Sequence, residues 1–301
     1  MKEFQEIITN DGSLTLQSFQ FKESFHSHEG ALKETKTKFI DPAKIERFRN
    51  KSINVLDVCF GLGYNSAYLF NILLNQSSFL NWYALEIDKR PLDYAIKKNL
   101  FKNLWGPKII RIFKSLFKVG HFSDKYFNCK MLWGDARKEI NKIPESMKFD
   151  LIFLDGFSPQ KCPEVWSIEF LTKLKNKLKF QGYLITYSSS AAVRKTLITI
   201  GLKVYKIKPK LETSKIWSNG TLAILDDNND TENNNSYIEK LTLKEYEHLE
   251  TKASIPYRDP KCDSLSQEII KRREKEQFLS KLLQTNLWRK KWQMTKSTFK
   301  G

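Results

Sequence analysis

Apolar runs that end in a carboxylate recur along the chain and alternate with segments of helical periodicity. The clearest run is Phe149–Asp155, which is followed at once by Gly156-Phe157-Ser158-Pro159. A run that is apolar on both faces is typical of a strand inside a parallel sheet, and the glycine and proline end it. Asp155 is therefore predicted at the carboxyl end of a strand, where open α/β sheets bind ligands. Capping of the following turn is the alternative role of this carboxylate.

The remaining strands and helices are predicted from the same rhythm. Further strands are predicted at 55–59, 81–86, 129–136, 182–187, 202–207 and 221–225. Helices are predicted at 66–74, from Pro91 onward, and at 108–119, 165–178 and 191–200. Strands that alternate with helices in this way predict an α/β fold with a seven-stranded, mostly parallel, doubly wound sheet and right-handed crossovers. The seventh strand is expected to insert antiparallel.

The two ends of the chain differ from this core, which is predicted to span residues 54–225. Residues 1–53 predict a β-rich appendage with a turn at Asn10-Asp11-Gly12-Ser13. The stretch 226–236 is rich in Asn and Asp, which is typical of a flexible linker. Residues 237–301 are predicted to form a basic, helical extension.

The amino-acid composition indicates a class of binding partner and a cellular compartment. The 301 residues carry 51 Lys and Arg against 34 Asp and Glu, a net charge of +17, which favours nucleic acid as the partner. A solvated lysine surface is the alternative. Neither a membrane span nor a signal peptide is expected, and the four separated cysteines indicate reduced thiols, so we expect a cytoplasmic protein.

Basic and aromatic side chains alternate in two segments, 102–128 and 268–292. Such mixtures can supply phosphate contacts and base stacking, although solvated helix faces are an equally good interpretation. The pair His26 and His28 has no further Cys or His nearby. It is a weak ligand set, so no metal is expected, and the segment 25–28 is interpreted as structural or substrate-facing.

A glycine-containing turn follows the first core strand. Phe60-Gly61-Leu62-Gly63-Tyr64-Asn65 joins that strand to the helix from Ser66, and such turns bring backbone N–H groups close to a ligand. Ser66 stands where the dinucleotide fingerprint has its third glycine, and no Lys-Ser/Thr pair follows, so neither NAD nor ATP is favoured.

Two further strands end in acids. Glu86 ends the strand 81–86, where a carboxylate can accept hydrogen bonds from both hydroxyls of a ribose. Asp88 is the alternative acid, or a cap for the helix from Pro91. Asp135, at the end of the third strand, could bond an adenine amino group.

The order of the strand-end motifs resembles that of the Rossmann-like methyltransferases that use S-adenosylmethionine. These motifs are Asp57-x-Cys59-x-Gly61-x-Gly63, Glu86, Gly134-Asp135-Ala136 and Asp155-Gly156. Residues 59–65 together with 155–166 resemble the MnmC/MnmD-like tRNA methyltransferase family in particular, and the resemblance covers roughly residues 5 to 225. No FAD-binding oxidase half follows, which suggests the stand-alone form. Cys59 and Leu62 depart from the family's usual Gly and Thr.

The resemblance implies a reaction. It implies methylation of the 5-aminomethyl group of the wobble uridine, giving 5-methylaminomethyl-(2-thio)uridine, in the anticodon loop of a tRNA that an upstream enzyme has supplied with the amine. It implies Asp155 as the catalytic carboxylate. Its other site residues would be Phe60, Gly61, Gly63, Asn65, Glu86, Asp135 and Ala136 for the cofactor, and Phe157, Pro159 and Trp166 for the substrate base.

Two other functions stay open at this point. A spermidine-synthase-like aminopropyltransferase would share the fold, the strand-end acids and an amine substrate. A catalytically silent RNA-binding module with a methyltransferase-like core would share the charge. The +17 surface argues against the first, and the acids at all three strand ends argue against the second.

Overall fold

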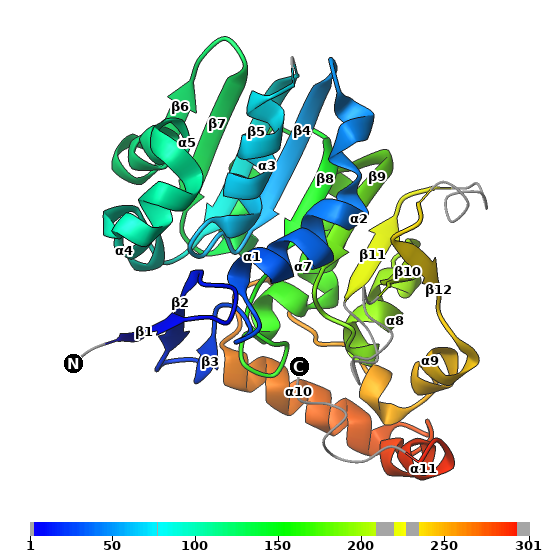
Figure 1. The fold of residues 1–301 in the computed structure, drawn as a ribbon. Helices are drawn as coiled ribbons and strands as arrows, with labels where there is room; N and C mark the ends of the chain where they lie inside the picture. The colour runs from blue at the N-terminus through cyan, green and yellow to red at the C-terminus, as the bar shows by residue number, and fades with distance from the viewer. Residues whose placement is uncertain (1–2, 77, 209–219, 227–234, 294–301) are drawn as a thin grey trace. The chain divides into compact units, whose positions relative to one another are not determined.

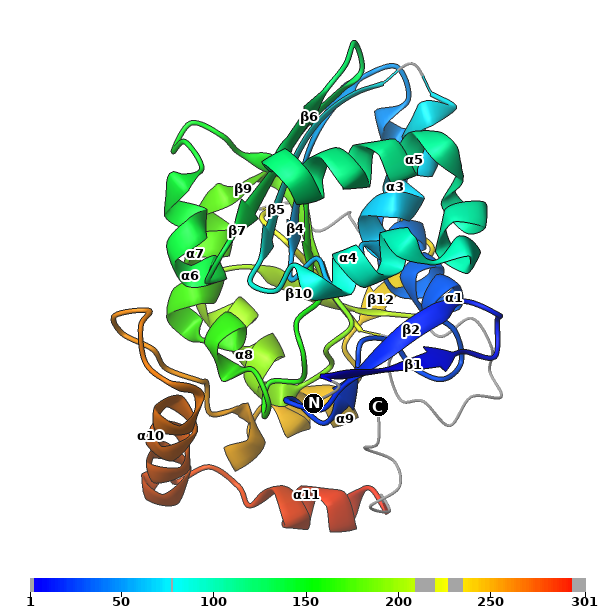
Figure 2. The ribbon, with the colours of Figure 1, turned by 90° about the vertical axis from the view of Figure 1, so that its left-hand side faces the viewer.

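The computed structural model describes residues 3–76, 78–208, 220–226 and 235–293 (Figures 1 and 2). The chain divides into two compact units, Met1–Phe157 and Ser158–Gly301. The boundary falls inside the segment that the sequence predicts as one core, and the predicted domain limits stay a prediction.

The sheet of the first unit has the strand order β8-β4-β5-β7-β6. Its strands are β4 (Ser52–Val58), β5 (Phe79–Glu86), β6 (His121–Ser123), β7 (Phe127–Trp133) and β8 (Phe149–Leu154). The register pairs Val58 with both Leu85 and Leu154, so the carboxyl ends of the parallel strands meet at one edge. The predicted strand ends are thereby confirmed. The short strand β6, antiparallel to β7, was missed because three residues are too few to show the period of a strand.

Helices cover this sheet, with α3 and α5 on one face (Figures 1 and 2). The unit contains α3 (Tyr64–Leu74), α4 (Arg90–Lys97), α5 (Asn99–Val119) and α6 (Ala136–Glu139), followed by the 3-10 turn η3 (Ile140–Lys142). Between α3, α5 and the strands, the rings of Phe70, Trp82, Phe113 and Phe127 form a buried cluster. The helix predicted at 108–119 begins earlier, at Asn99, and is broken at Gly106, where φ is 72° and ψ is 170°.

The predicted N-terminal hairpin is confirmed. It pairs β1 (Phe4–Ile8) with β2 (Leu14–Ser18), and β3 (Glu23–Ser24) adds to β2. Short helical turns follow, namely α1 (Ala31–Thr35), the π-helical η1 (Lys36–Ile40), α2 (Asp41–Ala43) and η2 (Ile45–Phe48). The Tyr64 hydroxyl donates to the Leu14 carbonyl at 2.8 Å and accepts from the Leu14 N–H at 3.1 Å. This pair of bonds ties the hairpin to the start of α3.

The second unit has an antiparallel set of strands. Their order is β9 (Leu178–Thr186), β11 (Thr221–Ile224), β10 (Lys203–Ile207) and β12 (Ile238–Lys240). β11 is antiparallel to both β9 and β10, which confirms the expected antiparallel insertion. The strand β12 was not predicted. Because β6 and β12 are present in addition to the predicted strands, the described residues contain more core strands than the seven expected.

The second unit also contains η4 (Pro163–Trp166), α7 (Ile168–Lys177) and α8 (Ala191–Thr199), and then the expected helical extension. That extension consists of α9 (Leu243–His248), η6 (Lys252–Ser254), α10 (Ser266–Leu279) and α11 (Thr285–Lys291). A buried ion pair of 2.8 Å between Arg194 and Glu245 joins α8 to α9. Most of the predicted linker lies outside the described residues. No described helix is both long and apolar enough to span a bilayer.

Candidate active site

The turn between β4 and α3 has a left-handed backbone at three positions. The angle φ is 66° at Cys59, 57° at Gly61 and 90° at Gly63. A side chain at Gly63 would clash, because its Cβ would lie 2.4 Å from Cζ of Phe60. The Phe60 ring is itself buried against Trp82, so only the backbone of this predicted cofactor residue is placed to face a ligand.

Glu86 holds this turn in place from the end of β5. Its carboxylate accepts the Gly61 N–H at 2.8 Å and the Asp88 N–H at 2.8 Å. Burial raises the pKa of Glu86, while the backbone donors oppose that rise. Each carboxylate oxygen can still accept a second hydrogen bond. The geometry thus leaves Glu86 able to bind a polar ligand at the sheet edge.

Ser66 and Asp57 form a buried pair behind the turn. The Ser66 hydroxyl donates to Asp57 Oδ2 at 2.5 Å and accepts from Trp82 Nε1 at 2.8 Å. Burial raises the pKa of Asp57 to about 7, although the bond from Ser66 opposes the rise. Among the described residues, the other oxygen, Oδ1, has no hydrogen-bond partner. Ser66 is therefore needed for these two hydrogen bonds, which a glycine at position 66 could not form.

Asp155 lies directly after β8, and its N–H donates to the Val58 carbonyl of β4 at 3.1 Å. Asn65, in the first turn of α3, donates from Nδ2 to Asp155 Oδ2 at 2.8 Å. Burial raises the pKa of Asp155 to about 8, the Glu34 carboxylate adds to the rise, and Asn65 opposes it. Asn65 Oδ1 is buried and has no hydrogen-bond partner among the described residues. Asp155 therefore forms a polar pair with Asn65, and this pair includes a hydrogen-bond acceptor, Asn65 Oδ1, that has no partner among the described residues.

Glu34 is a site residue whose role sequence reasoning missed. Its carboxylate accepts the Ser27 N–H at 2.7 Å and pairs with Lys38 at 2.6 Å. Burial acts to raise the pKa of Glu34, but Lys38, His26 and the hydrogen bonds outweigh it, so the Glu34 carboxyl ionises at a lower pH than the Asp155 carboxyl. The spacing of four residues between Glu34 and Lys38 is a local sequence pattern that predicts their ion pair on a helix. Its closeness to Asp155 depends on the docking of the N-terminal segment.

Three aromatic rings gather over the turn. Phe157 stacks on Phe21 at a centroid distance of 4.4 Å and meets Phe25 edge-on at 4.9 Å. Phe25 in turn covers Gly61, where a Cβ would lie 3.1 Å from its ring. Phe157, a predicted substrate residue, is half-buried here. Phe21 was not predicted as part of the site, whereas the segment that contains Phe25 was expected to be structural or substrate-facing.

The other predicted substrate residues lie in the second unit. Pro159 is buried, and Trp166 has no exposed surface and meets Tyr187 edge-on. A base can stack only on an accessible ring face, so the contact predicted for Trp166 requires its neighbours to move.

Asp135 caps α6 at the end of β7. Its carboxylate accepts the Arg137 N–H at 2.9 Å and forms an ion pair with that guanidinium at 2.6 Å. Burial acts to raise the pKa of Asp135, but Arg137 lowers it below its ordinary value. Ala136, the next residue, opens the helix and is buried. An adenine contact at these two residues stays a prediction.

The histidine near the site is a structural residue. His26 is packed against Tyr64, and its Nδ1 lies 2.9 Å from the Thr15 hydroxyl. Burial lowers the pKa of His26 to about 4, so the ring is neutral. Within the described ranges, no three His, Cys, Asp or Glu side chains are grouped to hold a metal ion.

Comparison with known proteins shows to which family this chain is similar. A family model described as S-adenosyl-L-methionine-dependent methyltransferase matches residues 101–216. The crystal structure of MnmC2 from Aquifex aeolicus is 30% identical and superposes with a TM-score of 0.77, over 91% of this chain and 84% of that one.

Two curated relatives extend the comparison. The uncharacterized protein MJ0670 of Methanocaldococcus jannaschii is 29% identical over all of this chain and 81% of its own length. The tRNA 5-methylaminomethyl-2-thiouridine biosynthesis bifunctional protein MnmC of Leptospira borgpetersenii is 28% identical over 64% of this chain. The match spans 31% of that bifunctional relative.

Proposed function

Because the chain belongs to the MnmC family of S-adenosyl-L-methionine-dependent methyltransferases, we propose that it methylates the 5-aminomethyl group of the wobble uridine in tRNA. The observation that carries the proposal is the Asp155–Asn65 pair, a carboxylate of raised pKa beside the glycine turn. The relatives named for tRNA 5-methylaminomethyl-2-thiouridine biosynthesis support the choice of substrate.

The residues at the sheet edge fit the cofactor. S-adenosylmethionine supplies a methyl group on a sulfonium together with a charged amino acid and a nucleoside. The left-handed turn at Gly61 and Gly63 lets the backbone approach the amino-acid part, and Glu86 can accept from the ribose. Asp135 and Ala136 are assigned to the adenine.

The amine must lose a proton before it can attack. An alkylammonium has a pKa of about 10.4, so transfer of its proton to an ordinary carboxylate of pKa about 3.9 costs about 9 kcal/mol. With the pKa of Asp155 raised to about 8, the same transfer costs about 3 kcal/mol. Burial and the nearby Glu34 thus make the ionised Asp155 carboxylate a stronger base, and the ionised fraction increases as the pH approaches 8. Such a base is typically worth ~10²–10⁴-fold in rate.

Asn65 is assigned a positioning role in this reaction, in addition to the cofactor contact expected of it. Its Nδ2 holds one oxygen of Asp155, and its Oδ1 is an acceptor without a partner among the described residues. An amine next to this pair could donate to Asp155 and, once Asn65 Oδ1 becomes accessible, to Asn65 as well. Two fixed acceptors orient the nitrogen lone pair, and such alignment can contribute more than proton transfer itself.

The aromatic cluster supplies a surface for the base. Unpaired bases of RNA loops are bound by stacking on aromatic rings. Phe157, supported by Phe21 and Phe25, is half-buried and follows Asp155 by two residues. Phe157 is therefore the proposed stacking residue, and the substrate contacts expected of Pro159 and Trp166 stay predictions.

The proposed substrate, a tRNA that already carries a 5-aminomethyl group, implies which partners the protein has. The aminomethyl group has to be installed by another enzyme before this reaction, so the proposal implies a supplying enzyme and a cytoplasmic tRNA pool. The anticodon loop is the proposed contact region of the tRNA.

The test uses purified protein, S-adenosylmethionine with a labelled methyl group, and tRNA that carries 5-aminomethyluridine. Nucleoside analysis is expected to show label in 5-methylaminomethyluridine. Asp155→Asn should reduce the rate by at least ~10²-fold. Asp150→Asn, at the opposite end of β8, is the matched control and should retain the rate, because Asp150 binds the Asn54 N–H away from the site. An unlabelled wobble nucleoside would refute the function, and full activity of Asp155→Asn would refute the assigned base.

A further inference from the structure

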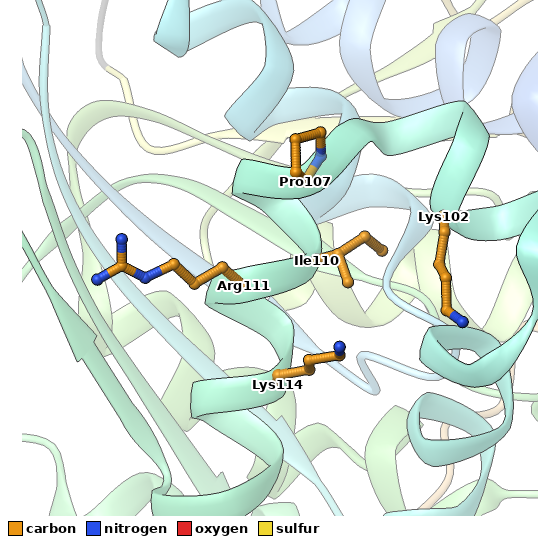
Figure 3. Close-up of a pocket in the computed structure, with 5 residues that line it drawn as sticks. All are labelled: Lys102, Pro107, Ile110, Arg111 and Lys114. Carbon is orange, nitrogen blue, oxygen red and sulfur yellow. The ribbon is translucent and has the colours of Figure 1, made fainter.

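A groove lies beside α5 where the helix is broken. Its volume is about 500 Å³, and Figure 3 shows the five side chains that line it, Lys102, Pro107, Ile110, Arg111 and Lys114. Lys102 precedes the break at Gly106, and the other four follow it. The left-handed glycine and the proline after it let the chain change direction, which opens space between the two helical segments.

A second hollow borders the first. It has a volume of about 360 Å³ and is lined by Pro107, Lys108, Arg111, Phe122, Ser123 and Asp124. Asp124 already accepts the N–H groups of Tyr126 and Phe127, and Lys108 lies 3.6 Å from it. Pro107 and Arg111 line both hollows, so the two recesses adjoin along one helix.

The first groove is purely cationic in its charged side chains. It contains Lys102, Arg111 and Lys114 and no acid. Arg111 and Lys114 are exposed and form no ion pair within the described ranges, and Lys102 has only a 3.4 Å contact to the Asn99 amide oxygen. Three cations around one hollow repel each other, and a bound anion relieves that repulsion.

The shape of the groove indicates the kind of anion. A guanidinium can bind phosphate oxygens with two parallel hydrogen bonds, and lysines add charge at its sides. Ile110 and Pro107 supply an apolar wall against which a sugar can lie. Two recesses that share an arginine suit consecutive phosphates of a polynucleotide better than one small anion.

We propose that the groove of Lys102, Arg111 and Lys114 holds backbone phosphates of the tRNA, apart from the nucleotide that reacts. The inference rests on the proposed function for the identity of the RNA. Contacts of this kind position the nucleic acid and carry no sequence information.

The test compares two triple variants with equal loss of charge. The groove variant is Lys102→Gln, Arg111→Gln, Lys114→Gln. The control variant replaces exposed cations near the amino ends of β4 and β8, as Arg49→Gln, Lys51→Gln, Lys148→Gln. Binding of tRNA is measured by fluorescence anisotropy at several salt concentrations, and binding of S-adenosylmethionine by calorimetry verifies that both variants are folded.

Each phosphate contact contributes ~0.7–0.9 to the slope of log Kd against log salt, so the groove variant should flatten that slope by about 2–3 and weaken binding by about 10- to 100-fold near 0.15 M salt. The control variant should change the slope by less than one. Equal effects of the two variants would overturn the proposal. Binding that weakens as expected, with tRNA that is never methylated, would refute the proposed function and leave the groove as an RNA site.

Discussion

Replacement of Asp155 by asparagine should make the protein more stable, and increasingly so as the pH rises. The pKa of Asp155 is raised from 3.8 to about 8 by burial and by Glu34. In the unfolded chain the carboxyl ionises near pH 4, whereas in the folded protein it holds its proton until about pH 8. The wild-type protein therefore loses stability between these pH values. Asparagine cannot ionise, and its side-chain oxygen can still accept from Asn65.

The expected size follows from the pKa difference. Each pH unit between the two pKa values corresponds to 2.303RT, about 1.4 kcal/mol, so a rise from pH 5 to pH 8 costs the wild type about 4 kcal/mol. Asp155 is half-buried by its accessible surface, and water reduces the cost. We expect about half of it, so the stability advantage of Asp155→Asn should grow by about 2 kcal/mol over this range.

The assay is urea unfolding of both proteins at pH 5, 6, 7 and 8, followed by tryptophan fluorescence. The raised pKa of Asp57 makes both proteins less stable as the pH rises, so most of this contribution is removed in the difference. The repulsion between Asp57 and Asp155 remains in it, because Asp57 is one cause of the raised pKa of Asp155. Asp124→Asn is the control, because the pKa of Asp124 is lowered and its ionisation lies below the pH range of the experiment. A stability difference between wild type and Asp155→Asn that is constant with pH, or that shrinks as pH rises, would refute the electrostatic account of the site.

The glycine turn yields two further predictions. Cys59→Gly should stabilise the protein by about 0.5–1 kcal/mol in urea unfolding, because the left-handed φ of 66° disfavours a side chain by more than the added flexibility of glycine costs; a loss of stability would show that contacts of the Cys59 side chain outweigh the strain. Gly63→Ala should cost about 3 kcal/mol and weaken binding of S-adenosylmethionine in calorimetry, because its Cβ would lie 2.4 Å from Phe60 Cζ. Gly12→Ala, also at a positive φ but with nothing within 4 Å of its Cβ, separates strain from clash, and equal costs at both glycines would contradict the packing argument.

Local patterns sufficed for the elements that place the site. The carboxylates of Glu86 and Asp155 were predicted at strand ends because burial on both faces makes a strand continuously apolar until it leaves the sheet. Parallel pairing then requires that these ends share an edge. The same reasoning could not find β6 or β12, because strands of three residues are too short for periodicity to identify.

The composition of the site depended on contacts between distant segments. Glu34 lies more than a hundred residues from Asp155 along the chain, yet its charge helps to set the pKa of that carboxylate. Phe21 and Phe25 reach the glycine turn only because the hairpin is anchored to Tyr64. No spacing in the sequence encodes such proximity.

The sequence by itself thus determined the order of the longer strands and helices of the core, the glycine turn and the acids that end the strands. Each of these follows from backbone geometry and burial within a few residues. The tertiary structure alone decided the protonation of Asp155, the unsatisfied acceptors of Asp57 and Asn65, and the cationic groove at α5. Those properties arise from the electric field and the space that remote side chains create together, and they exist only once the chain has folded.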